Sequence, residues 1–363
     1  MRVKLKEICT KITDGSHFSP MDNENGYPML SIQDMSTNGF DYSKCKHISQ
    51  SDYDTLVKNG CKPEQNDVLI AKDGSYLKEI FVVKESKEEV ILSSIAILRP
   101  DINIVNPCFL KYYLSTERIK NEVSKKYVSG SVLKRIILKN FENIEIDLPD
   151  RKTQDKIVEI LSGIDNQIEH NNIMAKKLQV LGSTTYGKEL RSAKSFKSID
   201  SSEIKIGKED ANFATINGKY NFFTCSENTF LCDEFAFEGK SILIAGNGNF
   251  NVKFSDGQFN AYQRVYVISN DKEYGNLYYT CLHNIRTLSQ KSNGSIIKFL
   301  TLDMLKNIVV PIFDDNINNL LNNVVLKIHK TNIQTKKLVN LKESLLPLLI
   351  NGQLHFINKV EEV

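Results

Sequence analysis

A long helical segment occurs twice in this chain, and this repeat constrains the fold more than any other feature. Both copies contain the pattern Ile-x4-Ile-x2-Lys-Lys-Leu-x2-Leu, in residues 168–181 and again in residues 328–341. Ile168 corresponds to Ile328 and Leu181 to Leu341, and the matched positions between them share the same offset. An internal repeat fixes the architecture before any local motif is considered, because each repeat is one folded unit. The sequence therefore predicts two related globular domains, each followed by a long helix.

The apolar residues of both helical segments recur at alternating intervals of three and four, which is the spacing of a coiled-coil seam. Both seams are interrupted at the same place, by Asn171 and Asn172 and by Thr331 and Asn332. Because each helix follows its own domain, the repeat predicts an antiparallel pair whose register the polar interruption sets. The alternative is that each helix lies on the surface of its own domain. The residues predicted to pair the helices are all apolar: Ile157, Leu161, Ile164, Ile168, Leu178, Leu181, Leu321, Val324, Ile328, Leu338, Leu341 and Leu345.

Composition restricts the class of protein. A chain of 363 residues is too long for one ordinary core, so two domains with connecting elements are expected. No apolar run reaches the roughly 18–20 residues of a membrane span, and the N-terminus lacks the apolar stretch of a secretion signal. We therefore expect a cytoplasmic protein with no membrane partner. A net charge of +3 permits nucleic-acid binding but does not argue for it.

No motif in the sequence predicts catalysis. The seven cysteines form no Cys-x2-Cys pair and the six histidines have no ligand spacing, so neither a zinc site nor another metal site is expected. Glu238, Lys240 and Asp233 resemble an acidic-lysine nuclease motif only superficially, because their spacing is wrong. The chain has no Gly-x-Ser-x-Gly turn and no Asp/Asn-Pro-Pro-Tyr/Phe tetrapeptide. We expect a chain that is not an enzyme and carries no cofactor of its own.

Two segments share the same order of elements and define the expected domains. Residues 1–150 and 196–315 each contain a buried strand, a turn, further strands, a helix, a Gly-Ser loop and a last short strand. Asp67–Ser75 aligns with Ser241–Asn249, and Ser129–Ser131 aligns with Asn293–Ser295. The expected helices cover residues 151–195 and 316–358.

Two kinds of loop are candidate ligand sites. The turns at residues 72–76 and 246–250 combine small polar residues with an aromatic, such as Tyr76, although a plain hairpin turn uses the same residues. The Gly-Ser loops at residues 128–135 and 291–298 bring backbone N–H groups and cations together, as DNA phosphates require, although a solvated basic loop would look alike. The candidate residues of the Gly-Ser loops are polar or basic: Ser129, Ser131, Lys134, Arg135, Lys291, Asn293, Ser295 and Lys298.

Four stretches together resemble the specificity (S) subunits of type I restriction–modification systems. Residues 13–32 are similar to the opening motif of that family, and residues 67–75 with 92–100 are similar to a strand pair of its target recognition domains. Residues 148–161 and 345–356 resemble the beginning of its first conserved helix and the end of its second. The second half departs from the pattern, because residues 311–316 lack the glutamine found at Gln154 and its domain lacks the Ser-Ser-x-Ala segment.

The resemblance implies an α+β fold with two α/β target recognition domains, joined by two long helices that form an antiparallel coiled coil. Each domain would read one half of a bipartite sequence in double-stranded DNA, and the helices would set the spacer and dock two modification subunits. S-adenosylmethionine, ATP and Mg²⁺ would then be bound by partners, namely those methyltransferase subunits and a restriction and translocation subunit. The alternative is a helical scaffold protein without sequence-specific DNA reading. Residues able to read base edges are polar or basic: Lys72, Ser75, Lys78, Asn247, Asn249, Asn251, Gln263 and Arg264.

Overall fold

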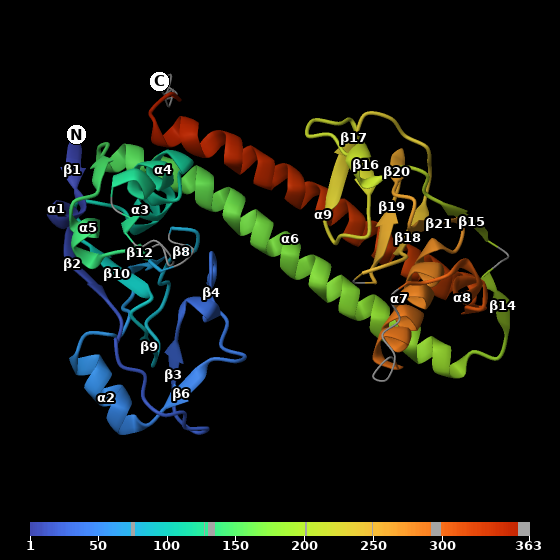
Figure 1. The fold of residues 1–363 in the computed structure, drawn as a ribbon, viewed down its shortest axis with the longest axis horizontal. Helices are drawn as coiled ribbons and strands as arrows, with labels where there is room; N and C mark the ends of the chain where they lie inside the picture. Colours follow the sequence, from blue (N-terminus) through green and yellow to red (C-terminus); the bar gives the residue numbers. More distant parts are fainter. Residues whose placement is uncertain are drawn as a thin grey trace, which may run out of the picture. The chain divides into compact units, whose positions relative to one another are not determined.

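A computed structural model describes residues 1–73, 77–126, 128–129, 135–199, 202–248, 250–291 and 299–354. The chain divides into two compact units, Met1–Asp165 with Val339–Val363, and Asn166–Leu338. Two long helices, α6 (Arg151–Ser192) and α9 (Asp315–Ile350), each contribute residues to both units (Figure 1). We call the units the first and the second unit, and the globular part of each its domain.

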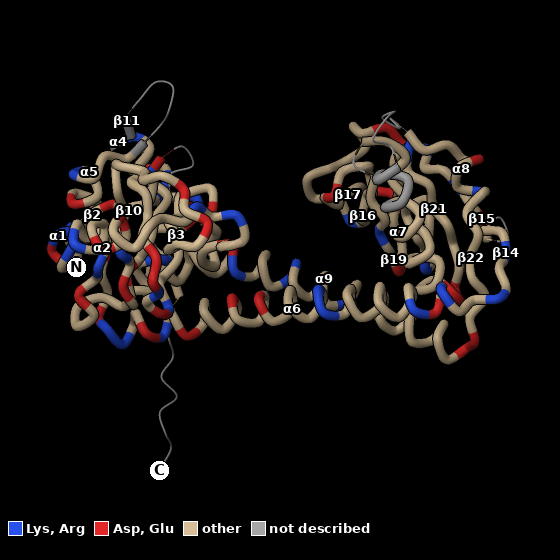
Figure 2. The backbone as a smooth tube through the Cα atoms, turned by 90° about the horizontal axis from the view of Figure 1, so that it is seen from below, with Lys and Arg blue, Asp and Glu red and all other residues tan. Residues whose placement is uncertain are grey.

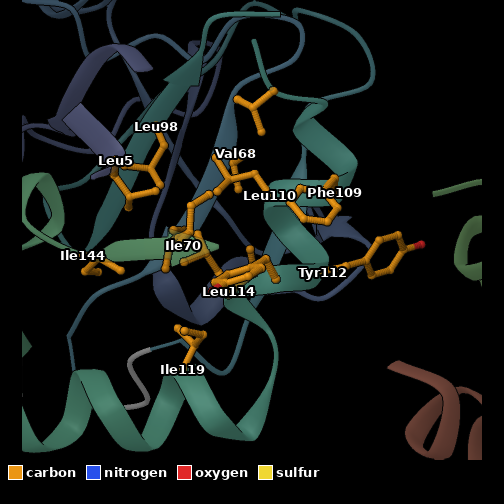
Figure 3. Close-up of a cluster of buried hydrophobic side chains, with 14 of the residues drawn as sticks. Leu5, Val68, Ile70, Leu98, Phe109, Leu110, Tyr112, Leu114, Ile119 and Ile144 are labelled. Atoms are coloured by element: carbon orange, nitrogen blue, oxygen red, sulfur yellow. The ribbon is translucent and has the colours of Figure 1, made fainter. Parts of the chain in front are cut away.

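The first domain is built on an antiparallel sheet in the order β2 (Cys9–Asp14), β10 (Ile95–Pro100), β7 (Val68–Ala71) and β8 (Ile80–Val82). All of β7 is buried, because Val68 and Ile70 face one apolar cluster while Leu69 and Ala71 face another. This explains the unbroken apolar run in the sequence, which is typical of a strand covered on both faces. Helix α3 (Pro107–Leu114) packs on the first of these faces (Figure 3).

The single helix that the sequence predicted between the strands and the Gly-Ser loop of the first domain is in fact two helices, α3 and α4 (Glu117–Lys126). The Ser115 hydroxyl donates to the Lys111 carbonyl at 2.7 Å and the Thr116 hydroxyl donates to the Tyr113 carbonyl at 2.8 Å. These side chains satisfy carbonyls at the end of α3 and so favour termination there. The other elements of this domain are β1 (Arg2–Lys4), α1 (Leu5–Ile8), β3 (Tyr27–Leu30), β4 (Met35–Ser36), β5 (Gly39–Phe40), β6 (Lys46–Ile48), α2 (Gln50–Lys58), β9 (Val90–Ile91), β11 (Val128–Ser129), β12 (Arg135–Ile136), α5 (Leu138–Glu142) and β13 (Glu145–Asp147).

The second domain repeats the topology of the first. Its main sheet has the order β15 (Glu203–Ile206), β21 (Val265–Ser269), β18 (Ser241–Ala245) and β19 (Val252–Ser255). A smaller sheet in each domain has a central strand with one antiparallel and one parallel neighbour: β3 between β6 and β9, and β16 (Tyr220–Phe223) between β17 (Thr229–Cys232) and β20 (Phe259–Ala261). The predicted doubling of the domain is confirmed. The other elements are β14 (Phe196–Ser198), α7 (Tyr274–Lys291), α8 (Leu302–Lys306) and β22 (Val309–Pro311).

Within each unit, parts of both long helices join the apolar core of the domain. In the first unit, Ile157 and Leu161 near the start of α6 and Leu349 near the end of α9 share one cluster with α3. In the second unit, Tyr186 near the end of α6 and Leu321 near the start of α9 share a cluster with α7. The helices therefore run antiparallel within each unit, side by side (Figures 1 and 2), and at the same time cover the domains.

The polar interruption lies on the buried side of both helices. Asn171 and Thr331 are only 5% and 6% exposed, whereas Asn172 and Asn332 are exposed. Two leucines that the repeat assigned to the pairing seam are not buried, because Leu181 and Leu341 are 48% and 47% exposed. In a seam with alternating intervals of three and four residues, the position after Leu338 is four residues on, at Lys342 and not at Leu341. The same interval from Leu178 in α6 leads to Gly182 and not to Leu181.

The second long helix ends at Ile350 and not at residue 358, and residues 355–358 lie outside the described part of the chain. Gly352 has a φ of +66°, its N–H donates to the Leu349 carbonyl at 3.2 Å, and the Gln353 N–H donates to the Leu348 carbonyl at 2.9 Å. This pair of bonds is the Schellman arrangement that closes a helix, and glycine adopts the left-handed conformation it needs without steric cost. The first long helix ends at Ser192, shortly before the predicted residue 195.

Gly182→Ala is expected to destabilise the second unit by about 2–3 kcal/mol, as overpacking does in a close-packed core. A Cβ atom at this position would lie 1.9 Å from the Tyr279 hydroxyl, and Tyr279 is buried against Tyr186. Hydrogen exchange of the α7 amides measures the loss. Gly187→Ala is the matched control in the same helix, because a Cβ there meets nothing within 4 Å, and it should be neutral or stabilising. Equal effects of the two substitutions would contradict the close contact.

Candidate nucleic-acid interface

Residues that flank the two kinds of candidate loop meet at one end of the main sheet in the first domain. Strand β7 leads directly into Lys72, whose carbonyl accepts a hydrogen bond from the Ile136 N–H at 3.0 Å. Ile136 belongs to β12, the strand that follows the Gly-Ser loop. Lys72 at the start of the turn and Ile136 just after the Gly-Ser loop are thus neighbours, although they are far apart in the sequence.

The second domain has the same arrangement. Strand β18 leads into Gly246, whose carbonyl accepts a hydrogen bond from the Leu300 N–H at 2.7 Å, and Asn247 forms a β-bridge with Phe299. The Tyr266 hydroxyl adds a bond of 2.9 Å to the Leu300 carbonyl and so holds the segment that follows the Gly-Ser loop to the sheet. Phe299 beside it is 57% exposed. We call this end of each main sheet the loop end.

At the loop end of the first domain, Lys72 is a structural residue. Its side chain is largely buried, and its ammonium lies 3.3 Å from an Asp14 oxygen and 3.6 Å from an Asp73 oxygen. His17 lies 3.5 Å from the same Asp14 carboxylate. Because its charge is already balanced inside the fold, Lys72 is not presented to a ligand as the sequence predicted. Lys78, by contrast, has a well exposed side chain 3.7 Å from Glu79.

At the loop end of the second domain, exposed polar side chains replace this ion pair. Gln263 and Arg264 are exposed just before β21, and Asn247 is half-buried. Asn251 instead holds the fold, because its amide donates to the Cys225 carbonyl at 2.9 Å. Lys253, which the sequence analysis did not single out, donates to the Thr224 carbonyl at 3.3 Å, and burial lowers the pKa of its ammonium.

Matched backbone positions carry different side chains in the two domains. The Ser93 N–H donates to the Ser16 carbonyl at 2.9 Å, and the Gln263 N–H donates to the Glu209 carbonyl at 2.8 Å, each between the same two elements. Ser93 and Ser94 therefore occupy the places of Gln263 and Arg264. One backbone frame thus carries two half-buried hydroxyls in one domain and an exposed amide with a guanidinium in the other. The Ser94 hydroxyl also accepts the Ile32 N–H at 3.3 Å.

Several candidate residues cannot be placed on this surface. For three of them, Ser129 in β11, Arg135 in β12 and Lys291 in α7, only the backbone is described. The following candidates lie outside the described residues: Ser75, Tyr76, Ser131, Lys134, Asn249, Asn293, Ser295 and Lys298.

The described part of the chain offers no metal centre. Among these residues, no group of three or more His, Cys, Asp or Glu side chains could hold a metal ion. Glu238 and Lys240 line a polar recess with Asn270 and Asp271 at the opposite end of the main sheet, and Asp233 is not in its lining. Acidic and basic residues are interspersed over both domains (Figure 2), in keeping with the small net charge. No helix of the described chain is long and apolar enough to cross a membrane.

The doubled domain and the two long helices shared by both units define a two-domain architecture, and comparison with known proteins identifies the family. The family model described as "Type I restriction modification DNA specificity domain" matches residues 1–180 and again residues 189–342. The chain belongs to this family.

Individual relatives agree with this assignment over parts of their length. The chain is 40% identical over 101 residues to the type I restriction enzyme EcoDI specificity subunit of Escherichia coli, covering 27% of this chain and 22% of that protein. It is 29% identical over 192 residues to the MjaVIII specificity subunit of Methanocaldococcus jannaschii, covering 52% and 43%. The matches thus span less than half the length of these relatives. In structure, the chain is similar to the S subunit of a type I restriction–modification system from M. genitalium, with a TM-score of 0.68 and 15% identity over 99% of this chain and 96% of that one.

Proposed function

We propose that this chain is the DNA sequence-specificity subunit of a type I restriction–modification complex, with each domain reading one half of a bipartite target at its loop end. One observation carries the proposal: a single backbone frame occurs twice, and the side chains at its matched positions differ. They are half-buried serines in the first domain and exposed Gln263 and Arg264 in the second. Hydroxyl, amide and guanidinium groups are those that discriminate base edges. A helical scaffold without DNA reading, the alternative function, gives no reason for this divergence at matched positions.

The long helices support a second part of the proposal, the docking of two modification subunits. The repeated pattern places apolar side chains at equivalent positions that are nearly half exposed, Ile173 and Ile333 at 46% and 41%, and Leu181 and Leu341 at 48% and 47%. Exposed apolar side chains at both copies of a repeat mark an interaction surface, and a two-fold repeat fits two copies of one partner. Methyl transfer with S-adenosylmethionine, and any ATP- and Mg²⁺-dependent cleavage, then take place on partner subunits in the cytoplasm.

Exchange of residues 196–315 for a recognition domain of another specificity subunit tests the function. The chimera and the natural chain are each co-expressed with the modification subunit, and genomic methylation is mapped by long-read sequencing. We expect one half-site to change while the other is retained, and we expect no methylation by the chain without the modification subunit. An unchanged methylation pattern would favour the scaffold alternative.

Arg264→Ala is expected to weaken specific DNA binding by about 1–3 kcal/mol and to relax one position of the second half-site, because an arginine that contacts a guanine makes two hydrogen bonds to it. Binding to matched and single-substituted duplexes measures both effects at fixed salt. Arg264→Lys is the control, since lysine keeps the charge but not the planar fork. If Arg264 contacts only phosphate, Lys restores the affinity and Ala lowers it equally for all sequences, which would remove Arg264 from base reading.

A further inference from the structure

A polar cluster joins α6, α9 and α3 in the first unit. The Asp165 carboxylate accepts a hydrogen bond from the Tyr112 hydroxyl at 2.8 Å and from the Lys342 ammonium at 2.5 Å. The Lys111 ammonium lies 3.5 Å away, on the Tyr112 side of the carboxylate. All three charged side chains are about three-quarters buried or more. Burial raises the pKa of Asp165, but Lys342, Lys111 and Tyr112 outweigh it, so the pKa lies below its ordinary value.

The repeat places a different set of residues at the equivalent point of the second unit. The offset that relates Ile168 to Ile328 also relates Asp165 to Val325 and Gly182 to Lys342. Tyr279 corresponds to Tyr112, because each lies at the same distance from the start of its helix, α7 or α3. The contacts agree with this correspondence. Lys342 lies over the Tyr112 ring at 5.5 Å, and Gly182 faces the Tyr279 hydroxyl so closely that no Cβ fits between them.

The equivalent point in the second unit therefore lacks both charges of the cluster. Val325 is 3% exposed and belongs to the apolar core there. The Tyr279 hydroxyl is buried and has no hydrogen-bond partner among the described residues. One tyrosine of the pair is thus bound by a carboxylate, and the other is enclosed by apolar groups and a glycine.

The difference matters because the two halves of the chain are alike enough to pair in the wrong combination. Helices α6 and α9 have matching seams. When two copies of the chain meet, α6 of one copy therefore competes with α9 for pairing with α6 of the other copy. In such a like-with-like pair, Gly182 of the second copy would take the place of Lys342, and Asp165 would lose its shortest contact. In the corresponding pair of two α9 helices, Lys342 would face Val325 and would have no carboxylate.

We infer that the Asp165–Lys342 pair makes the helices select each other within one chain, and that it excludes the exchange of like halves between two copies of the chain. Removing one partner of a buried ion pair is far more costly than replacing both. The two charges therefore favour α6–α9 pairing over like-with-like pairing, even where they add little net stability. The occupant excluded is a second copy of this same chain. This inference does not depend on DNA reading by either domain.

The test measures the association of two copies of the full chain. Two differently tagged copies are co-expressed and purified over both tags in turn, and the yield of doubly tagged complex is compared at equal chain concentration. For the natural chain we expect background only. For Asp165→Asn with Lys342→Met, and for Asp165→Leu with Lys342→Met, we expect a clearly higher yield, because like-with-like pairing then breaks no ion pair between the helices. Lys111 loses the Asp165 carboxylate in either pairing, so it does not favour one over the other. Lysine cross-linking should join Lys176 and Lys177 of one copy to the same residues of the other, a product that only two chains can give.

The matched control removes one pair of opposite charges from within a single helix. Glu117→Gln with Lys120→Met breaks the ion pair of 2.9 Å in α4 and should leave the yield at background. Circular dichroism establishes that each variant is folded, and the Asp165→Leu variant replaces the ion pair by apolar contacts in case the Asn variant is not. Folded double variants that stay at background, or that rise no more than the α4 control, overturn the inference.

Discussion

Asp67→Ala is expected to lower the free energy of unfolding of the first domain by about 3–5 kcal/mol, the cost of leaving a buried charge without its partner. Asp67 is completely buried at the start of β7, and its carboxylate accepts two hydrogen bonds from Arg99, at 2.8 and 2.9 Å. It also accepts the Glu64 N–H at 2.7 Å. The alanine would leave the Arg99 guanidinium, one-quarter exposed, with only the exposed Glu64 carboxylate at 2.8 Å.

The second domain provides the matched control for this prediction. Asp67 and Ser241 are equivalent residues of the two domains. Their neighbours on the adjacent strand are equivalent too, since Arg99 and Ser269 occupy the same position in β10 and β21. There the ion pair is replaced by a bond of 3.2 Å between the Ser241 and Ser269 hydroxyls. Ser241→Ala should therefore cost only about 1 kcal/mol, the net contribution of a neutral hydrogen bond.

Hydrogen exchange measured by mass spectrometry separates the two domains, which a single unfolding curve of a two-unit chain does not. Amides of β7 and β10 report on Asp67→Ala, and amides of β18 and β21 report on Ser241→Ala. Asp67→Ala with Arg99→Met removes both charges and should be less destabilising than Asp67→Ala alone. Equal losses for Asp67→Ala and Ser241→Ala would show that the Arg99 pair contributes no more than an ordinary hydrogen bond.

What the sequence predicted correctly rests on local patterns. The unbroken apolar runs at residues 68–71 and 242–245 specify strands buried on both faces, and the alignment of these runs gave the matched pairs across both sheets. The antiparallel pairing of the two long helices was predicted from a repeated pattern whose apolar residues have the spacing of a coiled coil. Asn351 and Gly352 also carried a signal for the end of α9, which the prediction extended to residue 358.

What the sequence did not reveal depends on residues that meet only in the fold. Lys72 appeared to be an exposed cation because Asp14, the carboxylate that neutralises it, lies far from it in the sequence, on another strand. Lys342 and Asp165 are on different helices, and no local pattern marks them as partners. Leu181 and Leu341 were placed in the seam because they are leucines in a repeat, whereas the geometry gives those places to Gly182 and Lys342.

The middle of the long helices is the place where residues can be inserted without damage to either domain, to test whether the helices set the length of the DNA spacer. Residues 166–177 of α6 and 329–344 of α9 contribute nothing to the apolar clusters of the described domains, whereas Tyr186 and Leu190 farther along α6 do. Both helices contribute residues to both units, so a test of the spacer hypothesis has to lengthen both. An insertion must therefore be made in α6 and α9 together, between Asn172 and Ile173 and between Thr335 and Lys336.

Four residues inserted at both points are expected to lengthen the unread spacer of the DNA target by one or two base pairs and to leave both half-sites unchanged. Four helical residues add about 6 Å and turn the distal domain by about 40°. One base pair adds about 3.4 Å, and it turns the duplex by about 35° because one turn takes roughly 10 base pairs. The rise corresponds to nearly two base pairs and the rotation to about one, and coiled coils accommodate a four-residue insertion by local unwinding.

Long-read methylation profiling of cells that carry the variant and the modification subunit gives both half-sites and the spacer in one measurement. The same four residues inserted after Gln353, beyond the end of α9, are the control and should leave the spacer unchanged. Insertion in α6 alone should abolish methylation, because it moves one seam past the other by more than a turn. A profile in which a half-site changes while the spacer stays fixed would show that the helices do not determine the distance between the two DNA-reading domains.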